Sequence, residues 1–258
     1  MCAARVLSIP LMPDNPNVPA IPGLSAVTLL PSAEVPTRHL AINLVRTEPL
    51  ADSPTHDHGK LDTMLYVLRG TMAFHCGRGM RQDIRVEAGE FAFIEPHAAH
   101  AEYNPDPAEY SLGISVRDTP GAFLYPCDPP SETQPERSGI VVVPRTVGPV
   151  NAAPPGEGAE GLAPLSKHHL RARRVALDRL TLAAGERISP ADAVAGETAL
   201  LVLEGSARLR DEGASVTLEG ASGHWWYIEP GTRWSIENVQ ADSIAELLLI
   251  RSAGGVRE

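Results

Sequence analysis

The chain has 258 residues, of which 43% are hydrophobic and 21% are charged, a balance typical of a soluble globular protein. Its formal net charge of -10 excludes the strongly basic surface that nucleic-acid binding needs, so we expect no nucleic-acid partner. The 24 prolines and 22 glycines favour many short strands and turns over long helices.

The cysteines and the apolar segments bear on where the protein works. Its three cysteines, Cys2, Cys76 and Cys127, form no CxxC pair and no even framework, which favours a reducing compartment. The apolar stretch at residues 6–12 is interrupted by Pro10, so it is too short to span a membrane and makes a poor signal peptide. We therefore expect a cytoplasmic protein with a small-molecule partner and no membrane contact.

The predicted elements are short runs rich in β-branched and aromatic residues, each closed by Gly or Pro. In chain order, the predicted strands are 39–45, 61–70, 73–76, 84–86, 89–96, 110–116, 175–182, 196–205, 207–209, 215–218, 223–230 and 245–250. Segments 126–138 and 149–161 are rich in Pro, Gly and Glu, which indicates a linker and an exposed loop.

An internal repeat organises these strands. LDTMLYVLRG at 61–70 returns about 135 residues later as GETALLVLEG at 196–205, and GEFAFIEP at 89–96 returns at nearly the same offset as GHWWYIEP at 223–230. A duplicated unit made of strands predicts an all-β protein with two tandem barrels. We place the domains at residues 1–134 and 135–258.

Three histidines in the first copy are candidate metal ligands. His56 and His58 are two residues apart, so in an extended segment both imidazoles point to the same side. His100 follows the strand at 89–96 and can supply a third imidazole. Neutral imidazoles suit a divalent ion such as Fe, Mn, Ni or Zn.

This pattern resembles the cupin superfamily (RmlC-like), whose motifs read G-x5-H-x-H-x3,4-E-x6-G and G-x5-P-x-G-x2-H-x3-N. The first motif is matched by His56 and His58, and the second by His100 and Asn104. No Glu stands at the fourth-ligand position: Thr63 occupies that register and Asp62 precedes it. The resemblance implies two double-stranded β-helix (jelly-roll) barrels, with Asp62 as a fourth metal ligand or as a partner that orients a histidine.

The second copy lacks these ligands. At the repeat offset, Ala191 and Ala193 replace the first two histidines and Trp234 replaces the third. The chain therefore resembles a bicupin with a metal site in its N-terminal barrel only. We expect the cluster formed by Trp225, Trp226, Tyr227 and Trp234 to fill the core of the second barrel, with a ligand-binding or dimer surface as the alternative.

The function expected from this site is that of a metal-dependent enzyme acting on a small oxygenated organic molecule. The resemblance implies an Fe(II)-type dioxygenase, with a metal-dependent isomerase, aminohydrolase or lyase, or a non-catalytic metabolite-binding cupin, as alternatives. Glu102 and Tyr103 are the candidate acid-base residues, and Asp62 is a further one. The resemblance also implies a homodimer.

Overall fold

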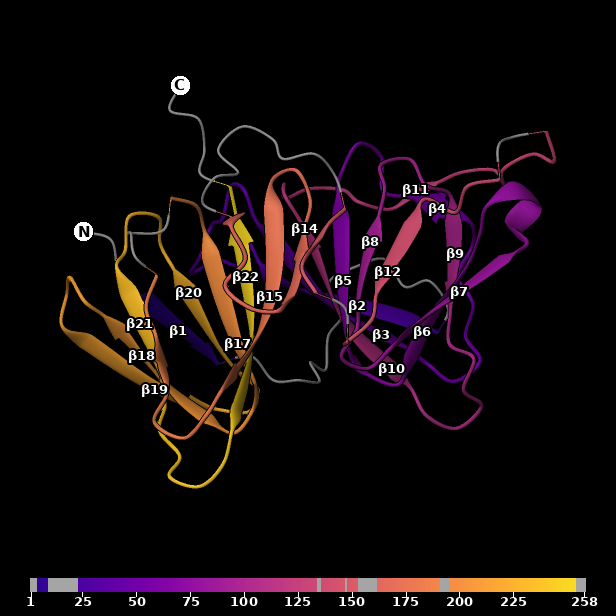
Figure 1. Ribbon diagram of the computed structural model, residues 1–258. Coiled ribbons are helices and arrows are strands. Elements are labelled where there is room, and N and C mark those ends of the chain that lie inside the picture. The colour runs from indigo at the N-terminus through magenta and orange to yellow at the C-terminus, as the bar shows by residue number, and fades with distance from the viewer. Residues whose placement is uncertain are drawn as a thin grey trace. The chain divides into compact units, whose positions relative to one another are not determined.

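Short runs of largely buried residues form the β-strands of the chain, and a 3₁₀ turn, η1, lies at Arg78–Met80. The computed structural model describes residues 4–8, 23–133, 136–146, 148–152, 162–190 and 195–253 (Figure 1). Two compact units divide the chain: residues 13–147, which we call the N-terminal barrel, and residues 1–12 with 148–258, which we call the C-terminal barrel. The predicted all-β class with two barrels is confirmed.

The N-terminal barrel consists of two antiparallel sheets. Their strand orders are β12-β8-β5-β10-β3-β2 and β11-β4-β9-β6-β7. The strands are β2 (Leu24–Leu30), β3 (Ala41–Thr47), β4 (His56–Asp57), β5 (Thr63–Arg69), β6 (Thr71–Cys76), β7 (Gln82–Glu87), β8 (Phe91–Ile94), β9 (His100–Tyr103), β10 (Ser111–Arg117), β11 (Tyr125–Pro126) and β12 (Ile140–Val143).

The C-terminal barrel repeats this arrangement with sheets ordered β1-β20-β17-β22-β15-β14-β13 and β16-β21-β18-β19. Its strands are β1 (Ala4–Ser8), β13 (Val150–Asn151), β14 (His168–Arg171), β15 (Val175–Leu182), β16 (Arg187–Ile188), β17 (Thr198–Glu204), β18 (Ser206–Asp211), β19 (Val216–Ala221), β20 (His224–Ile228), β21 (Trp234–Asn238) and β22 (Ala245–Ser252). Gly70 and Gly205, which end the first repeated block, have φ of 69° and 81°, a left-handed conformation that favours glycine in the tight turns they form.

Each barrel has its own apolar core. Leu65, Val67 and Phe74 belong to the cluster that fills the N-terminal barrel. Trp226 and Trp234 belong to the corresponding cluster of the C-terminal barrel, where both are almost completely buried. The predicted core-filling role of these tryptophans is confirmed.

The boundary between the units differs from the one predicted near residue 135. Strand β12 pairs with β8, so the chain up to residue 147 belongs to the N-terminal barrel. Strand β1 pairs with β20, so the start of the chain belongs to the C-terminal barrel. Part of the predicted loop at 149–161, residues 153–161, lies outside the described residues. Strands β12 and β1 are short edge strands whose partners are distant in sequence, so local sequence patterns do not reveal to which barrel they belong.

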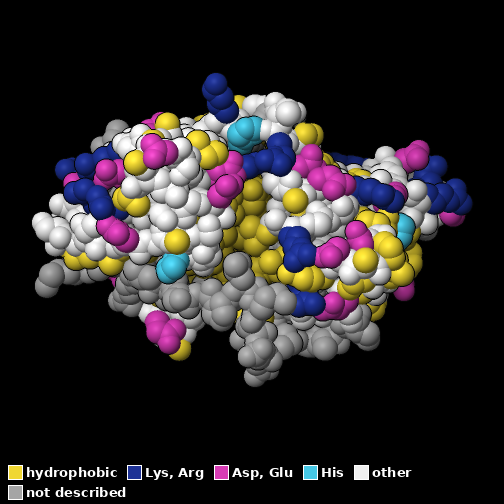
Figure 2. Space-filling model, turned by 90° about the horizontal axis from the view of Figure 1, so that it is seen from below, with side chains coloured by type: hydrophobic (Ala, Val, Ile, Leu, Met, Phe, Trp, Pro, Cys, Tyr) yellow, Lys and Arg dark blue, Asp and Glu magenta, His cyan; other side chains and the backbone are white. Residues whose placement is uncertain are grey.

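Charged side chains on the surface pair locally, as Arg81 does with Glu132 at 2.8 Å and Arg208 with Glu219 at 2.7 Å. On the face in Figure 2, basic and acidic side chains of the described residues are interspersed. Within the described parts of the chain, no helix has the length and apolar character required to cross a membrane.

Candidate metal centre

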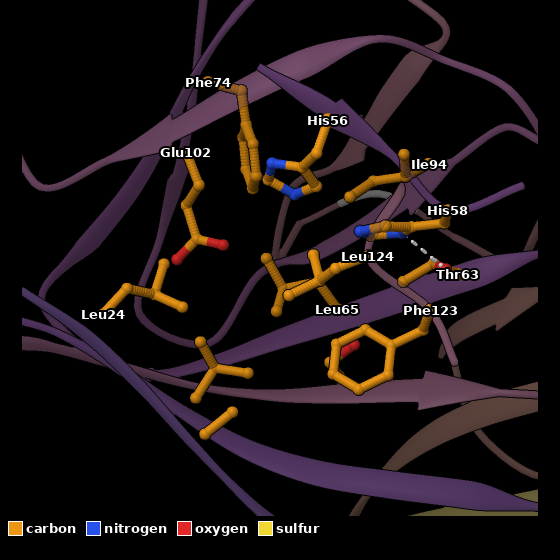
Figure 3. A pocket seen from close by; sticks show the side chains of 13 residues that line it. Leu24, His56, His58, Thr63, Leu65, Phe74, Ile94, Glu102, Phe123 and Leu124 are labelled. Atoms are coloured by element: carbon orange, nitrogen blue, oxygen red, sulfur yellow. Dashed lines mark hydrogen bonds between the residues drawn. The ribbon is translucent and has the colours of Figure 1, made fainter. Parts of the chain in front are cut away.

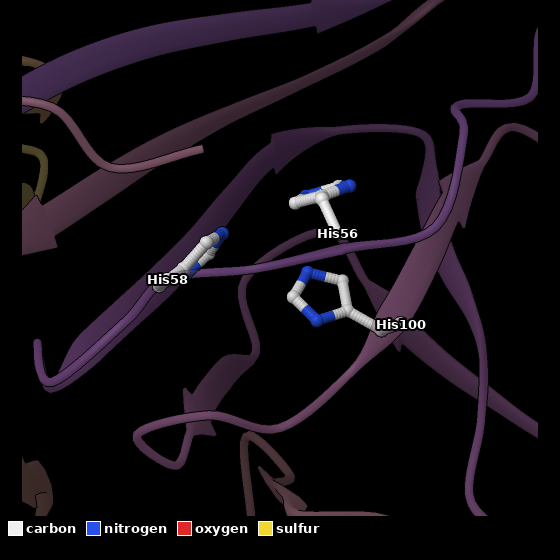
Figure 4. Close-up of side chains that lie close together, drawn as sticks. All are labelled: His56, His58 and His100. Carbon is white, nitrogen blue, oxygen red and sulfur yellow. The ribbon is translucent and has the colours of Figure 1, made fainter. Parts of the chain in front are cut away.

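Pairing between two short strands brings the three histidines of the N-terminal barrel together. His56 on β4 lies opposite His100 on β9, and His58 follows two residues after His56. The ring centroids of His56 and His100 are 4.5 Å apart, those of His58 and His100 4.9 Å, and those of His56 and His58 5.6 Å (Figure 4). One ligand atom from each ring lies within 4.8 Å of the others, so the three can hold a metal ion.

Hydrogen bonds fix which ring nitrogen of the histidines is free. His56 Nδ1 lies 2.9 Å from the carbonyl oxygen of Pro54, and His100 Nδ1 lies 2.7 Å from that of Ala98. A carbonyl oxygen only accepts hydrogen bonds, so each Nδ1 carries a proton and donates it. The lone pair of each Nε2 is therefore available to a metal, as in metal-bound histidines whose other nitrogen is held by an outer partner.

Burial keeps the three imidazoles neutral. All three side chains are buried, and desolvation is the largest cause that lowers the pKa of each ring. The pKa of His100 falls to about 4, and the pKa of His58 lies well below its usual value because the other two imidazoles and Arg117 add to the effect of burial. Neutral imidazole is the form that binds metal.

Thr63 orients His58, a role that the sequence reasoning did not assign. Its Oγ1 lies 2.7 Å from His58 Nδ1 inside the barrel. Thr63 stands where the cupin motif has its Glu, so its position in the motif was a usable signal. Asp62, the residue before β5, is not among the residues that line the cavity, whereas Thr63 is. Asp62 is buried, but it is not in the group of ligand atoms formed by the three histidines.

Glu102 brings a carboxylate to the same cavity. It lies on β9 two residues after His100, and its side chain points into the cavity beside His56 (Figure 3). Thr47 Oγ1 donates a hydrogen bond of 2.7 Å to Glu102 Oε1. Burial raises the pKa of Glu102 to about 7, against the lowering effect of the Thr47 hydrogen bond. Such a carboxyl group can take up or release a proton near neutral pH.

Tyr103 does not join the site. The pleat of β9 turns it away from the side that carries Glu102. Its hydroxyl donates a 2.5 Å hydrogen bond to Asp83 Oδ1, and its ring stacks on His75 with centroids 4.3 Å apart. The sequence prediction of a catalytic Tyr103 therefore finds no support in the geometry, because adjacency to Glu102 along a strand implies opposite faces.

The cavity around the histidines is small and mostly apolar. Leu65 and Phe74 form part of its wall, and Phe123 and Leu124 line it from the segment that follows β10. Its volume is about 40 Å³, which leaves room for a few water molecules. Residues 118–124, which we call the strap, are continuous with β11, and β11 pairs with β4 next to the histidines. The cavity as it stands is too small for an organic molecule, and Phe123 and Leu124 form the part of its wall that comes from the strap.

The C-terminal barrel provides an internal comparison at equivalent strand positions. Trp234 pairs with Asp211 as His100 pairs with Cys76, and Ile236 stands where the first barrel has Glu102. Leu182 stands in place of Thr47. Ala191 and Ala193, the predicted replacements of the other two histidines, lie outside the described residues. In the C-terminal barrel, apolar residues thus replace His100, Glu102 and Thr47, the threonine that donates a hydrogen bond to Glu102.

Comparisons with known proteins agree with this geometry. Residues 43–116 match the cupin domain model. The fold is similar to bacterial pirin YhhW from Escherichia coli in complex with nickel(II), at 19% identity and a TM-score of 0.60, over 90% of this chain and 93% of that one. It is also similar to a salicylate 1,2-dioxygenase variant from Pseudoaminobacter salicylatoxidans in complex with gentisate, at 13% identity and a TM-score of 0.63, over 98% and 82%.

A third similar structure is oxalate decarboxylase from Bacillus subtilis, at 15% identity and a TM-score of 0.58, over 88% of this chain and 71% of that one. Comparison with curated proteins finds no match. Residues 43–116 therefore match a cupin domain, and the two-barrel fold of the chain is similar to that of these solved structures.

Proposed function

We propose that the N-terminal barrel is the active site of a metal-dependent enzyme that oxidises a small oxygenated organic molecule with O₂. The observation that carries this proposal is the convergence of three buried imidazoles, those of His56, His58 and His100, with Nε2 free in His56 and His100. A bound Fe(II) would supply Lewis acidity and O₂ chemistry at this position. The similarity to a dioxygenase and to a nickel-bound pirin supports a redox-active divalent metal.

The residues around the cluster supply the other requirements of such a reaction. Glu102 is placed to accept a proton from a substrate hydroxyl group, since its carboxylate enters the same cavity as His56. Phe74 and Leu65 provide an apolar wall against which a carbon skeleton can pack. Phe123 and Leu124 exclude water once the strap closes over the substrate.

Metal analysis and O₂ consumption test the proposal. The protein, purified without a histidine tag, should contain a stoichiometric divalent metal, and the Fe(II)-loaded form should consume O₂ with a member of a panel that includes gentisate, salicylate and catechol. His100→Ala should lose the metal, whereas Glu102→Gln should keep it and lose turnover by about 100-fold or more. Fe(II)-loaded protein that never consumes O₂ with any oxygenated substrate would contradict the oxidase chemistry.

Glu102 also supports a second candidate, in which the metal acts as a Lewis acid in an isomerase, aminohydrolase or lyase reaction. A buried carboxyl group beside a metal cluster can move a proton without O₂. Turnover that persists in anaerobic buffer, and with Zn(II) in place of Fe(II), distinguishes this reaction from oxidation. The homodimer and the cytoplasmic location stay predictions, which light scattering and cell fractionation can test.

A further inference from the structure

A buried arginine lies beside the metal centre without an acidic partner. Arg117, the last residue of β10, is 1% exposed. Its Nη1 donates a 3.2 Å hydrogen bond to Ser115 Oγ, its Nη2 donates to Asn43 Oδ1, and its guanidinium lies 3.7 Å from the centre of the Phe123 ring. Each of these partners is neutral. Among the residues that the structure describes, no carboxylate contacts Arg117, and its Nε has no hydrogen-bond partner.

The position of Arg117 ties it to the cavity. It pairs across the sheet with Thr63, which orients His58. Two of its contacts, Ser115 and Phe123, line the cavity that holds the histidines. Its charge is also one of the causes that lower the pKa of His58. The guanidinium is therefore directly behind the cavity wall on the side of His58 and Phe123.

The C-terminal barrel shows how the same position is neutralised. Arg251 pairs with Thr198 and Ala176, as Arg117 pairs with Thr63 and Ala41, so the two arginines are equivalent. Arg251 Nη2 donates a 2.6 Å hydrogen bond to Asp178 Oδ2, and both side chains are buried.

Asp178 occupies the position of Asn43 in the N-terminal barrel, again by strand register. The barrel that lost the histidine of β9 thus has an arginine–aspartate ion pair. The barrel with the three histidines has the arginine and a neutral amide. An unpaired buried charge is destabilising, and such groups concentrate at binding and catalytic sites.

We propose that Arg117 binds the anionic group of the substrate, so that the metal centre acts on a small organic acid whose carboxylate replaces the counter-ion that Asn43 does not supply. Phe123 covers one face of the guanidinium and also lines the cavity, so one movement of the strap admits the substrate and uncovers Arg117. Arginine suits this role because its planar fork pairs with both oxygens of a carboxylate. That the bound anion is a substrate rests on the proposed function, whereas the anion site itself does not.

Benzoate and benzamide form a suitable pair of probes, since they are similar in size and shape and differ in charge. Titration calorimetry with the Ni(II)-loaded protein should show benzoate binding at least tenfold more tightly than benzamide. Arg117→Gln should bring the two affinities within about twofold of each other, and Arg117→Lys should restore part of the preference. Arg81→Gln, at an arginine whose side chain is 72% exposed, is the matched control and should leave the preference unchanged.

Asn43→Asp is the decisive variant, because it copies the ion pair of the C-terminal barrel into the N-terminal one. It should abolish the benzoate preference while the thermal midpoint stays equal or rises. If Arg117→Gln fails to fold, this variant carries the test alone. Equal binding of both probes to the wild type, or a preference that survives Asn43→Asp, would overturn the proposal. The same titrations without metal, together with the Ni(II) content, separate failure of the anion site from failure of the metal site.

Discussion

Replacing Thr63 by Val tests whether the metal centre depends on the residue that orients His58. The valine keeps a similar shape but removes the hydroxyl that lies 2.7 Å from His58 Nδ1, so this buried nitrogen loses its partner and the ring loses its fixed orientation. Loss of an outer partner of a metal-binding histidine weakens metal affinity about 10- to 100-fold, which corresponds to about 1.4–2.8 kcal/mol. We expect Thr63→Val to lie in this range.

Competition for Ni(II) against a chromophoric chelator measures this effect directly. Thr198→Val is the matched control, because Thr198 is the equivalent buried threonine of the C-terminal barrel. It should leave Ni(II) affinity unchanged. If Thr63→Val binds Ni(II) within twofold of the wild type, or if both variants weaken binding equally, Thr63 does not position His58 for metal binding.

Two further predictions concern the ion pair and the strap. Asp178→Asn should lower the free energy of unfolding of the C-terminal barrel by about 3–5 kcal/mol at pH 7, because Arg251 then lacks its buried counter-ion. Tryptophan fluorescence reports the unfolding of the C-terminal barrel selectively, since all three tryptophans lie in that barrel. As a control, Asp242→Asn at an exposed position should change the free energy of unfolding by less than about 0.5 kcal/mol. Burial raises the pKa of Asp178, but the His169 hydrogen bond and the charge of Arg251 outweigh it, so the pKa lies below its usual value. This stabilisation is therefore complete above the unfolded pKa of about 3.9 and is lost as the pH falls through the lower folded pKa. At that pH the free energies of unfolding of the wild type and of Asp178→Asn should converge. Phe123→Ala should speed removal of bound Ni(II) by EDTA, because the variant removes part of the cavity wall that the strap supplies, and an unchanged rate would show that the strap does not limit access.

The sequence predicted the features that recur in both halves of the chain. The repeat placed the equivalent strands correctly, because each of its blocks begins or ends at a glycine that a turn requires. The alternation rule brought His56 and His58 to one side, and the repeat offset identified Trp234 as the replacement of His100. These predictions succeed because they depend on local periodicity and on comparison of the chain with itself.

Other features of the site depend on which side of a strand a residue faces, or on contacts between distant strands. Asp62 was expected near the histidines from its chemistry, but the residue that contacts His58 is Thr63, the first residue of β5. Tyr103 was chosen for its closeness to Glu102 along the chain. Arg117 had a signal that went unused, since Arg251 stands about 134 residues later at the end of the matching strand. Its missing counter-ion becomes visible only when the register of β10 with β3 is known.

The pairing of β1 with β20 makes the C-terminal barrel discontinuous in sequence. Its edge strand comes from residues 4–8, and the whole N-terminal barrel is inserted between that strand and the rest of the unit. A fragment starting at residue 148 would expose the backbone of β20 as a free template for intermolecular pairing, which favours aggregation. A synthetic peptide of residues 1–12 should cap that edge when added in trans. Cleavage of the intact chain after residue 12 would then leave β1 joined to β20 through their strand ladder and no longer through the chain.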